Sequence, residues 1–158
     1  MTEARSGAAA TVLNSKIYVC GGWNGERALS TVEFYDSLSR RWFYIHSMPS
    51  PSYGLTTISN GSHIIVMSNY NRGIWSLNTE EDGAQWMILP PLKDSRQYFT
   101  VTKVGNEMVV VGGKNAKESL LSVEIYNGFT WNSGPSLPKA FYGHSCVVLS
   151  DETMRFMT

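Results

Sequence analysis

The stretch "YVCGGWNGERALSTVEFYD", Tyr18 to Asp36, places two adjacent glycines after a short apolar run and a tyrosine thirteen residues beyond the second glycine. A second stretch, "VVVGGKNAKESLLSVEIYN", Val109 to Asn127, has the same order and the same interval, here from Gly113 to Tyr126. Because one chain contains the same unit twice, the sequence predicts an architecture built from internal repeats.

Aromatic residues give the length of the repeat. Three tryptophans are 44 and 45 residues apart, at Trp42, Trp86 and Trp131. Three tyrosines are 45 and 44 residues apart, at Tyr53, Tyr98 and Tyr142. A proline follows each tryptophan, at Pro49, Pro90 and Pro138. These landmarks agree on a unit of about 45 residues, which is a length typical of propeller blades.

Within each unit, short runs of β-branched and aromatic residues alternate with turn residues, and this pattern predicts strands. The strands expected in the first unit are 8–13, 16–20, 29–35 and 41–45. Those expected in the second are 54–58, 63–67, 73–77 and 85–89. Those expected in the third are 98–103, 107–111, 119–126 and 130–132. Each unit is therefore predicted to be a four-stranded antiparallel meander.

A sheet of this size cannot bury both of its faces alone, so neighbouring sheets are expected to stack radially as a β-propeller. The order of a glycine pair, a tyrosine, a tryptophan and a proline-rich turn resembles Kelch repeats over nearly the whole chain. The residues that carry the resemblance are Gly21, Gly22, Tyr35 and Trp42 in the first unit and Gly112, Gly113, Tyr126 and Trp131 in the third. The second unit has Ser68-Asn69 and Leu77 at these positions but keeps Trp86.

These residues are interpreted as structural. A glycine pair lets the second strand leave its blade through backbone angles or close approaches that a side chain would block. The tyrosine and tryptophan are expected to fill the wedge between adjacent blades, because large aromatic rings bury the most area there. On this interpretation, the glycine pairs, Tyr35, Tyr126 and the three tryptophans hold the fold together.

The fold class predicted is all-β, a Kelch-type propeller with an incomplete ring. Its blades are expected at residues 3–51, 52–95 and 96–139, with a partial fourth blade at 140–158 that begins with "FYGHSCVVL". Two interpretations account for the incomplete ring. The favoured one is a piece of a larger six-bladed protein, and the alternative is a homodimer that completes one ring.

Composition limits the class of partner. Thirteen basic and thirteen acidic side chains cancel, which argues against a nucleic-acid or anionic-membrane partner. No apolar run approaches the roughly 20 residues that span a bilayer, and the first residues lack a secretory pattern. A cytoplasmic location is expected.

The loops between second and third strands and the loops between blades are expected on one face, because the strands of a meander alternate in direction. This face collects an excess of basic residues, together with aromatic side chains of the kind enriched in binding hot spots. It is predicted to bind a protein or peptide that is acidic, through Trp23, Asn24, Arg27, Tyr53, Asn69, Tyr70, Arg72, Arg96, Tyr98, Asn115 and Tyr142. The alternative is that these loops are merely polar and their aromatics cover the ends of the core.

An enzyme is the contrasting class. The three histidines, His46, His63 and His144, fall in different local contexts, and the common metal, nucleophile and dinucleotide motifs do not occur. Cys146 lies two residues from His144, but no third group completes a catalytic set. No catalytic residue, metal or cofactor is expected.

The family resemblance implies a more specific function. Units that contain "SVEFYD" and "SVEIYN" are similar to those of Kelch proteins that present substrates to cullin-based ubiquitin ligases. Other Kelch proteins bind actin or further cytoskeletal partners, and a smaller group are sugar-converting enzymes. The resemblance therefore implies a substrate adaptor first and a cytoskeletal protein second.

Overall fold

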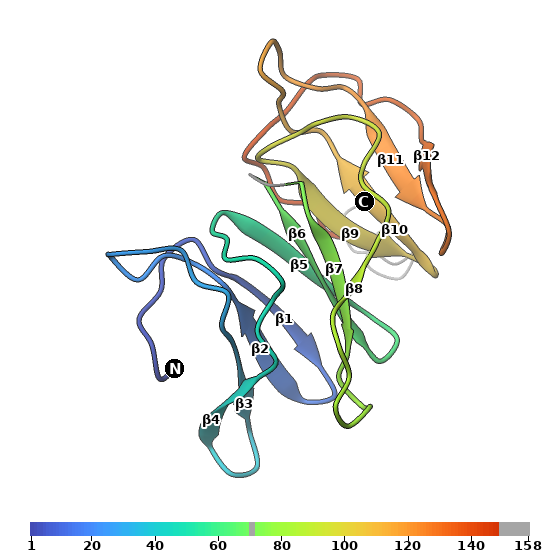
Figure 1. Ribbon diagram of the computed structural model, residues 1–158. Coiled ribbons are helices and arrows are strands. Elements are labelled where there is room, and N and C mark those ends of the chain that lie inside the picture. Colours follow the sequence, from blue (N-terminus) through green and yellow to red (C-terminus); the bar gives the residue numbers. More distant parts are fainter. Residues whose placement is uncertain (70–71, 149–158) are drawn as a thin grey trace, which may run out of the picture.

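The computed structural model describes residues 1–69 and 72–148, which form twelve strands in three antiparallel sheets (Figure 1). Blade 1 contains β1 (Ala9–Leu13), β2 (Lys16–Cys20), β3 (Val32–Asp36) and β4 (Arg41–Ile45). Blade 2 contains β5 (Leu55–Asn60), β6 (His63–Ser68), β7 (Ile74–Asn78) and β8 (Met87–Ile88). Blade 3 contains β9 (Thr100–Val104), β10 (Glu107–Val111), β11 (Val123–Tyr126) and β12 (Trp131–Ser133). The prediction of three four-stranded blades is confirmed.

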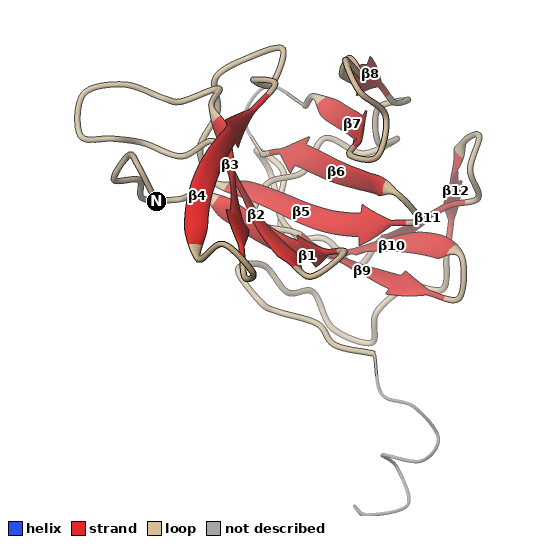
Figure 2. Ribbon diagram, turned by 90° about the horizontal axis from the view of Figure 1, so that it is seen from below, coloured by secondary structure: helices blue, strands red, loops and turns tan. Residues whose placement is uncertain are grey.

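The blades are arranged side by side around their first strands. In each sheet the strands follow one another in chain order, from the first strand to the fourth. The first strands β1, β5 and β9 lie next to one another, and the later strands extend outward from them (Figure 2). This arrangement is a sector of a propeller, with the first strands nearest the axis.

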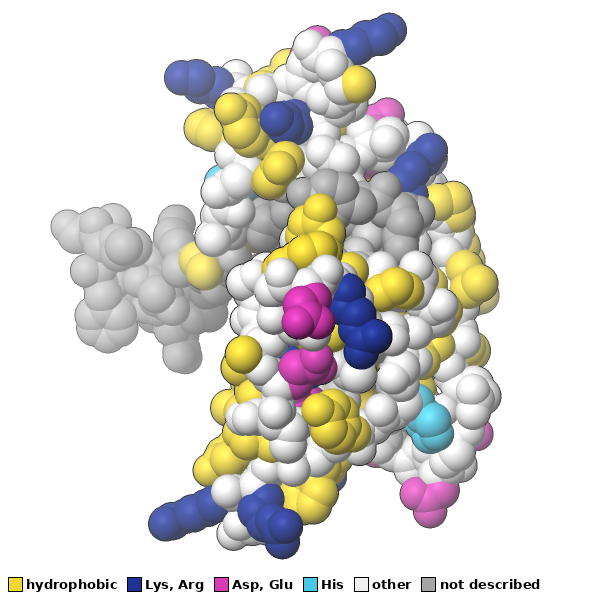
Figure 3. Space-filling view, turned by 60° about the vertical axis from the view of Figure 1, so that its left-hand side comes forward, with side chains coloured by type: hydrophobic (Ala, Val, Ile, Leu, Met, Phe, Trp, Pro, Cys, Tyr) yellow, Lys and Arg dark blue, Asp and Glu magenta, His cyan; other side chains and the backbone are white. Residues whose placement is uncertain are grey.

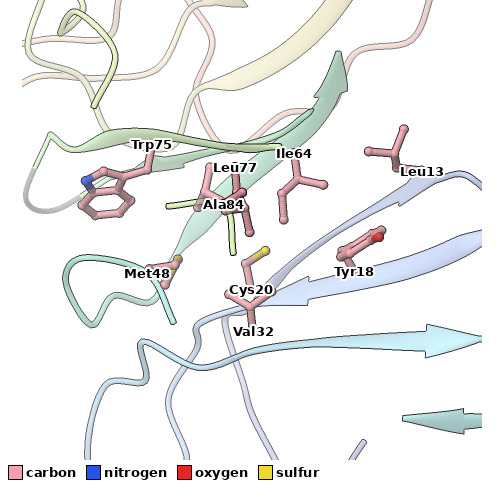
Figure 4. Close-up of a cluster of buried hydrophobic side chains, with 10 residues drawn as sticks. Leu13, Tyr18, Cys20, Val32, Met48, Ile64, Trp75, Leu77 and Ala84 are labelled. Carbon is pink, nitrogen blue, oxygen red and sulfur yellow. The ribbon is translucent and has the colours of Figure 1, made fainter. Parts of the chain in front are cut away.

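The core lies between the blades. Blades 1 and 2 share a cluster of buried side chains, and Figure 4 shows its members from both sheets converging: Leu13, Tyr18, Cys20, Val32, Met48, Ile64, Trp75, Leu77 and Ala84. Blades 2 and 3 share a second cluster, made of Ile65, Met67, Ile74, Phe99, Met108, Val110, Tyr126 and Trp131. Stacked neighbours thus bury the faces that a single four-stranded sheet would leave in water.

The indoles of Trp86 and Trp131 point back toward the preceding blade. Trp131 is only 2% exposed, and its Nε1 donates a hydrogen bond to the carbonyl oxygen of Pro90, at 2.9 Å. Trp86 donates in the same way to the carbonyl oxygen of His46, at 3.0 Å. Trp42 packs on Tyr35 with 5.3 Å between ring centroids, but it stays half-buried because no described blade precedes it.

The glycine pairs lie where three backbone segments meet. Gly112 and Gly113 have φ angles of 58° and 95°, in the left-handed region that side chains disfavour. A Cβ on Gly112 would lie 2.7 Å from the carbonyl oxygen of Phe141, and one on Gly113 would lie 2.7 Å from that of Gln97. Both the backbone angles and the close approaches therefore exclude a side chain.

Two differences between the predicted and observed strands exceed a shift of one or two residues at a strand end. The third strands of blades 1 and 3 begin at Val32 and Val123, later than expected, because the preceding residues close loops. Leu29 N donates to Gly22 O and Leu120 N to Gly113 O, both at 2.8 Å.

The predicted first strand of a fourth blade is the second difference. Residues 141–148 form no strand, and they have no described second strand to pair with. The segment is still held by the bond from Gly143 N to Tyr98 O, at 2.8 Å. The rest of the predicted blade, 149–158, lies outside the described residues.

No helix long and apolar enough to cross a membrane occurs in residues 1–69 and 72–148.

Candidate functional site

One end of the propeller sector is built entirely from loops. Antiparallel pairing brings the loops between second and third strands to the same end as the inter-blade segments. Several backbone bonds join the two kinds of segment, among them Gly22 N to Ser52 O at 2.9 Å and Gly113 N to Phe141 O at 2.8 Å. We call this surface the loop face, and it comprises 21–31, 46–54, 69, 72–73, 89–99, 112–122 and 134–144. Figure 3 turns the left-hand side of Figure 1 forward and shows hydrophobic side chains among basic and acidic ones.

The junction between blades 1 and 2 carries an exposed aromatic pair. Trp23 comes from the β2–β3 loop and Tyr53 from the segment that leads into blade 2. Their ring centroids are 5.7 Å apart in an edge-on arrangement, which is a favourable geometry for aromatic rings. Both rings remain exposed to solvent.

The far end of the loop face, beside blade 3, carries a second exposed pair with a cation. Tyr98 and Tyr142 have ring centroids 6.4 Å apart. The Lys114 ammonium lies 5.1 Å from the centroid of Tyr98 and 5.2 Å from that of Tyr142. Contact with both rings holds the Lys114 charge in place at the surface.

Tyr98 has an unusual backbone conformation. Its φ is 54°, whereas the residues at the equivalent entry of the other units are glycines, Gly7, Gly54 and Gly143, with φ between 59° and 65°. Tyr53 and Tyr142 precede such a glycine, but Tyr98 occupies the glycine position itself. The three tyrosines of the sequence period are therefore not equivalent, and the ring of Tyr98 is presented by a strained backbone.

Asn69 bridges two blades. Its Oδ1 accepts a bond from Tyr98 N at 3.1 Å, and its Nδ2 donates to Gly54 O. At the neighbouring junctions the backbone bonds directly, from Gly54 N to Gly7 O at 2.7 Å and from Gly143 N to Tyr98 O. The Asn69 amide thus completes a hydrogen-bonded chain between the blade entries.

Asn24 and Asn115 shape their own loops. Asn24 Oδ1 accepts from Glu26 N at 3.0 Å and from Arg27 N at 2.9 Å. Asn115 Oδ1 accepts from the N–H groups of the two equivalent positions, at 2.8 and 2.9 Å. These Asx turns position the adjacent charged side chains at the surface, including exposed Arg27.

The sequence predicts that Arg96 contacts a partner, but the structure buries its side chain. Arg96 is 3% exposed and lies beneath the loop face. Its Nη1 donates to Gly112 O and to Ser122 O, both at 2.9 Å, and its Nη2 pairs with Glu124 Oε1 at 2.7 Å. Buried in this way, the guanidinium ties an inter-blade segment to the glycine pair.

A second network of the same design was missed from the sequence. Arg5 Nη1 donates to Gly21 O at 2.7 Å and to Thr31 O at 3.1 Å, and Arg5 Nη2 pairs with Glu33 Oε1 at 2.6 Å. Both side chains are fully buried. The signal that could have found it is an offset of 91 residues, which relates Arg5 to Arg96, Glu33 to Glu124 and Gly21 to Gly112.

The carboxyl of Glu33 is held ionised by its partners. Burial alone would raise its pKa, but hydrogen bonds from the backbone and hydroxyl of Thr2 and the ion pair with Arg5 outweigh burial. Together they lower the pKa of Glu33 below its usual value.

Blade 2 lacks this ion pair. Trp75 stands in the strand pairing where Glu33 and Glu124 stand in the other blades. Ser52 stands two residues before the entry glycine, as Arg5 does, and bonds Ser68 through their hydroxyls at 2.7 Å. Both Ser52 and Trp75 are buried, so a neutral pair replaces a charged one.

The loop face carries less positive charge at its surface than the sequence predicts. Arg96 is buried, and Glu3 lies beside this face, where its carboxylate accepts a bond from Asn24 Nδ2 at 3.0 Å. Arg72 is exposed with φ at 58°. Tyr70, the remaining predicted contact, lies outside the described residues.

Potential metal ligands do not cluster in the part of the chain that the structure describes. Among residues 1–69 and 72–148, no three His, Cys, Asp or Glu side chains are close enough together to hold a metal ion. Cys146 Sγ lies 3.6 Å from Thr100 Oγ1, and Cys20 is buried, which raises the pKa of its thiol to about 12. Neither thiol forms a disulfide.

A comparison with protein families finds the same repeated unit that the sequence pattern predicts. A model of the Kelch motif matches residues 4–49 and 95–138, which contain blades 1 and 3. Blade 2 falls in the interval between the matches, as expected from its missing glycine pair and tyrosine.

Several curated proteins are similar over most of the chain. Alpha-scruin from Limulus polyphemus is 27% identical over 99% of this chain, which spans 19% of alpha-scruin. Human Kelch-like protein 23 is 27% identical over 93% of this chain, which spans 27% of that protein. Among solved structures, YjhT superposes with a TM-score of 0.77 and 13% identity, covering 89% of this chain and 58% of YjhT.

Proposed function

The chain belongs to the Kelch-repeat family, and from this premise we propose that its loop face binds a protein or a peptide. The observation that carries the proposal is the pair of exposed aromatic contacts, Trp23 with Tyr53 and Tyr98 with Tyr142. Both contacts lie on loops that rigid blades hold in place, which is the usual arrangement of a recognition surface.

Exposure of these rings favours a binding role. Tyr142 is 55% exposed and the other three rings are about two-fifths exposed, so much of their apolar area is left in water. Covering that area with a partner releases water from it and is favourable, at about 25 cal/mol per Å². Tyrosine and tryptophan also carry polar groups that can bond a partner at the edge of the contact.

The partner that best fits the face is acidic. Lys114 lies near two of the rings, and the loop face also carries the exposed basic side chains Arg27, Arg72, Lys117 and Lys139. A carboxylate near Lys114 would gain both its charge and the donors of the flanking tyrosines. The expected ligand is therefore a peptide segment with aspartate or glutamate next to apolar residues.

The biological role proposed is that of a substrate adaptor in the cytoplasm, in which these loops select a protein for a ubiquitin ligase. Similarity to Kelch-like proteins supports this role, although the chain spans only about a quarter of the Kelch-like relatives described above. The second candidate is a cytoskeletal binding protein. In either case the proposed mechanism is recognition without catalysis.

Affinity capture tests the binding face. The chain is immobilised as wild type and as the variant Trp23→Ser with Tyr142→Ser, and bound proteins are identified by mass spectrometry. We expect at least one protein that wild type captures and the variant loses. Loss is expected because removing two hot-spot aromatics costs about 4 kcal/mol, or roughly a thousandfold in affinity.

The matched control makes the same changes away from the loop face. Leu38 and Phe129 lie on turns at the opposite end of the strands and are 93% and 85% exposed. The variant Leu38→Ser with Phe129→Ser should capture the same proteins as wild type. If every captured protein is retained by the loop-face variant, or lost from both variants, the proposed location is incorrect.

A further inference from the structure

A cleft of about 440 Å³ opens between blades 1 and 2 and reaches the loop face only at His46. It lies beside the β7–β8 connection, which is at the opposite end of the strands from the loops described above. Its walls include Tyr18, Phe34, Tyr44, Leu77, Glu81 and Asp82. A volume of this size lies within the range of roughly 300–1,000 Å³ typical of ligand sites.

The cleft exists because blade 2 has a leucine where blade 3 has a tyrosine. Leu77 pairs with Ile64 across the sheet, as Tyr126 pairs with Met108 in blade 3. In blade 3 the Tyr126 ring packs against Trp131, with 5.0 Å between centroids, and fills the wedge toward blade 2. A leucine is smaller than a tyrosine, so the equivalent wedge between blades 1 and 2 keeps open space.

One wall of the cleft belongs to a row of aromatic rings across blade 1. Tyr18 and Phe34 have centroids 5.7 Å apart, and Phe34 and Phe43 have centroids 5.3 Å apart. The Lys16 ammonium lies 4.7 Å from the Phe34 centroid, and the Arg41 guanidinium lies 5.9 Å from that of Phe43. Two cations of the protein itself thus lie over rings of this row, because the negative face of an aromatic ring attracts a positive charge.

Carboxylates lie on the facing wall. Glu81 and Asp82 line the cleft and are exposed, and neighbouring Glu80 is tied to blade 1 by Asn14 Nδ2, at 2.7 Å. Lys16 and His46 also line the cleft. Among the lysine and acidic side chains that line the cleft, two carboxylates outnumber one ammonium.

We propose that this cleft binds an arginine or lysine side chain from a basic peptide segment. The cation would pair with Glu81 and Asp82, while the aliphatic part of its side chain would lie against Tyr44, which lines the cleft and is 52% exposed. Such a ligand differs in charge from the acidic partner expected at the loop face, so the two surfaces would bind different segments.

Binding of an acetylated, amidated triarginine peptide to the full chain tests the proposal, with calorimetry as the readout. The variant Leu77→Tyr fills the wedge without changing charge, and we expect it to weaken triarginine binding at least about tenfold, or about 1.4 kcal/mol of binding free energy. Leu121→Tyr makes the same change on an exposed residue of the loop face and should leave affinity unchanged. Unchanged affinity in Leu77→Tyr overturns the proposal.

A second pair of variants keeps the test decisive if Leu77→Tyr does not fold. Glu81→Gln with Asp82→Asn removes two exposed carboxylates at the cleft, and Glu26→Gln with Glu118→Gln removes two at the loop face. We expect the first pair to weaken triarginine binding several-fold more than the second. Equal losses would mean general charge attraction and would overturn the proposal.

Discussion

Tyr98 shows how one residue can combine a strained backbone with an exposed ring. A left-handed conformation costs a side chain roughly 1–2 kcal/mol relative to glycine, and glycines occupy the equivalent entries. The ring nevertheless lies where Tyr142 and Lys114 meet it. Strain of this kind is found most often at functional positions, which agrees with a contact role for Tyr98.

Substitution of Tyr98 separates backbone strain from ring contacts. Tyr98→Gly and Tyr98→Ala both lose the ring, but only glycine relieves the strain, so Tyr98→Gly should be more stable by about 1 kcal/mol. Urea unfolding measures the difference. At Tyr53, whose φ lies outside the left-handed region, the order should reverse because glycine gains entropy in the unfolded state. Equal stability of the two Tyr98 variants would contradict the strain.

Glu33 predicts a dependence of stability on pH. Its pKa is lowered in the folded protein, so its contribution is fully present above the unfolded value of about 4.3 and is lost as pH falls through the folded pKa. The difference in unfolding free energy between wild type and Glu33→Gln should be constant from about pH 7 to pH 5 and should shrink below about pH 4.

Urea unfolding at a series of pH values from about 7 to 3 measures this difference. Exposed Glu26 serves as the control, and Glu26→Gln should differ little from wild type at any of these pH values. A Glu33 difference that stays the same between pH 5 and pH 3 would rule out the lowered pKa.

At the residue scale the sequence predicts some positions and not others. The glycine pair was predictable, because its spacing to the tyrosine recurs and few other residues fit such a junction. The burial of Arg96 was not, because an arginine on a loop looks the same whether it points to solvent or pairs with a carboxylate 28 residues away. The contacts of Asn69 were not predictable either, because its amide joins Gly54 O in its own blade to Tyr98 N of the next blade.

At the scale of the blade, the same buried position is filled by an ion pair in two blades and by neutral side chains in the third. In blades 1 and 3, a buried arginine in the segment that leads into the blade pairs with a glutamate of the third strand. Blade 2 uses Ser52 and Trp75 at these positions. Replacing a buried ion pair by apolar groups of suitable volume is often neutral or stabilising, whereas leaving one charge alone costs about 3–5 kcal/mol.

Transplanting the ion pair into blade 2 tests this equivalence. Trp75→Glu alone should destabilise the protein by at least about 3 kcal/mol, because it buries a carboxylate without a cation. Adding Ser52→Arg should restore part of the loss, with a favourable coupling of about 2 kcal/mol in a double-mutant cycle. The pair Ser52→Arg with Trp75→Gln lacks the ion pair and should show little coupling. Zero coupling in the charged pair would mean that the positions are not equivalent.

The sequence predicts the order and approximate position of the strands well, but it predicts their first residues less accurately. The second strands of blades 1 and 3 and the fourth strand of blade 1 have the predicted bounds, since turns delimit them at one end. The third strands begin later because apolar residues such as Leu29 and Leu120 are buried in loops. An apolar side chain does not reveal whether its backbone pairs with a strand or closes a turn.

At the scale of the molecule, the place of a blade decides what its aromatic residues contribute. Trp131 has a blade on the side to which its indole points, and Trp42 has none among the described residues. Trp131→Ala should cost about 3–5 kcal/mol of unfolding free energy, as for a large buried aromatic. Trp42→Ala should cost about 1 kcal/mol. Thermal and urea unfolding check both values, and equal costs would contradict the asymmetry.

The bonds from indole to carbonyl have a direction along the chain, since Trp86 and Trp131 each reach an oxygen that precedes them by about forty residues. When the ribosome has delivered Trp86, its acceptor at His46 has already been synthesised, and the same holds for Trp131 and Pro90. Blades 2 and 3 can therefore each pack against a blade that has already been synthesised. Co-translational assembly can proceed one sheet at a time, and no sheet needs to wait for a later one to supply the acceptor of its indole.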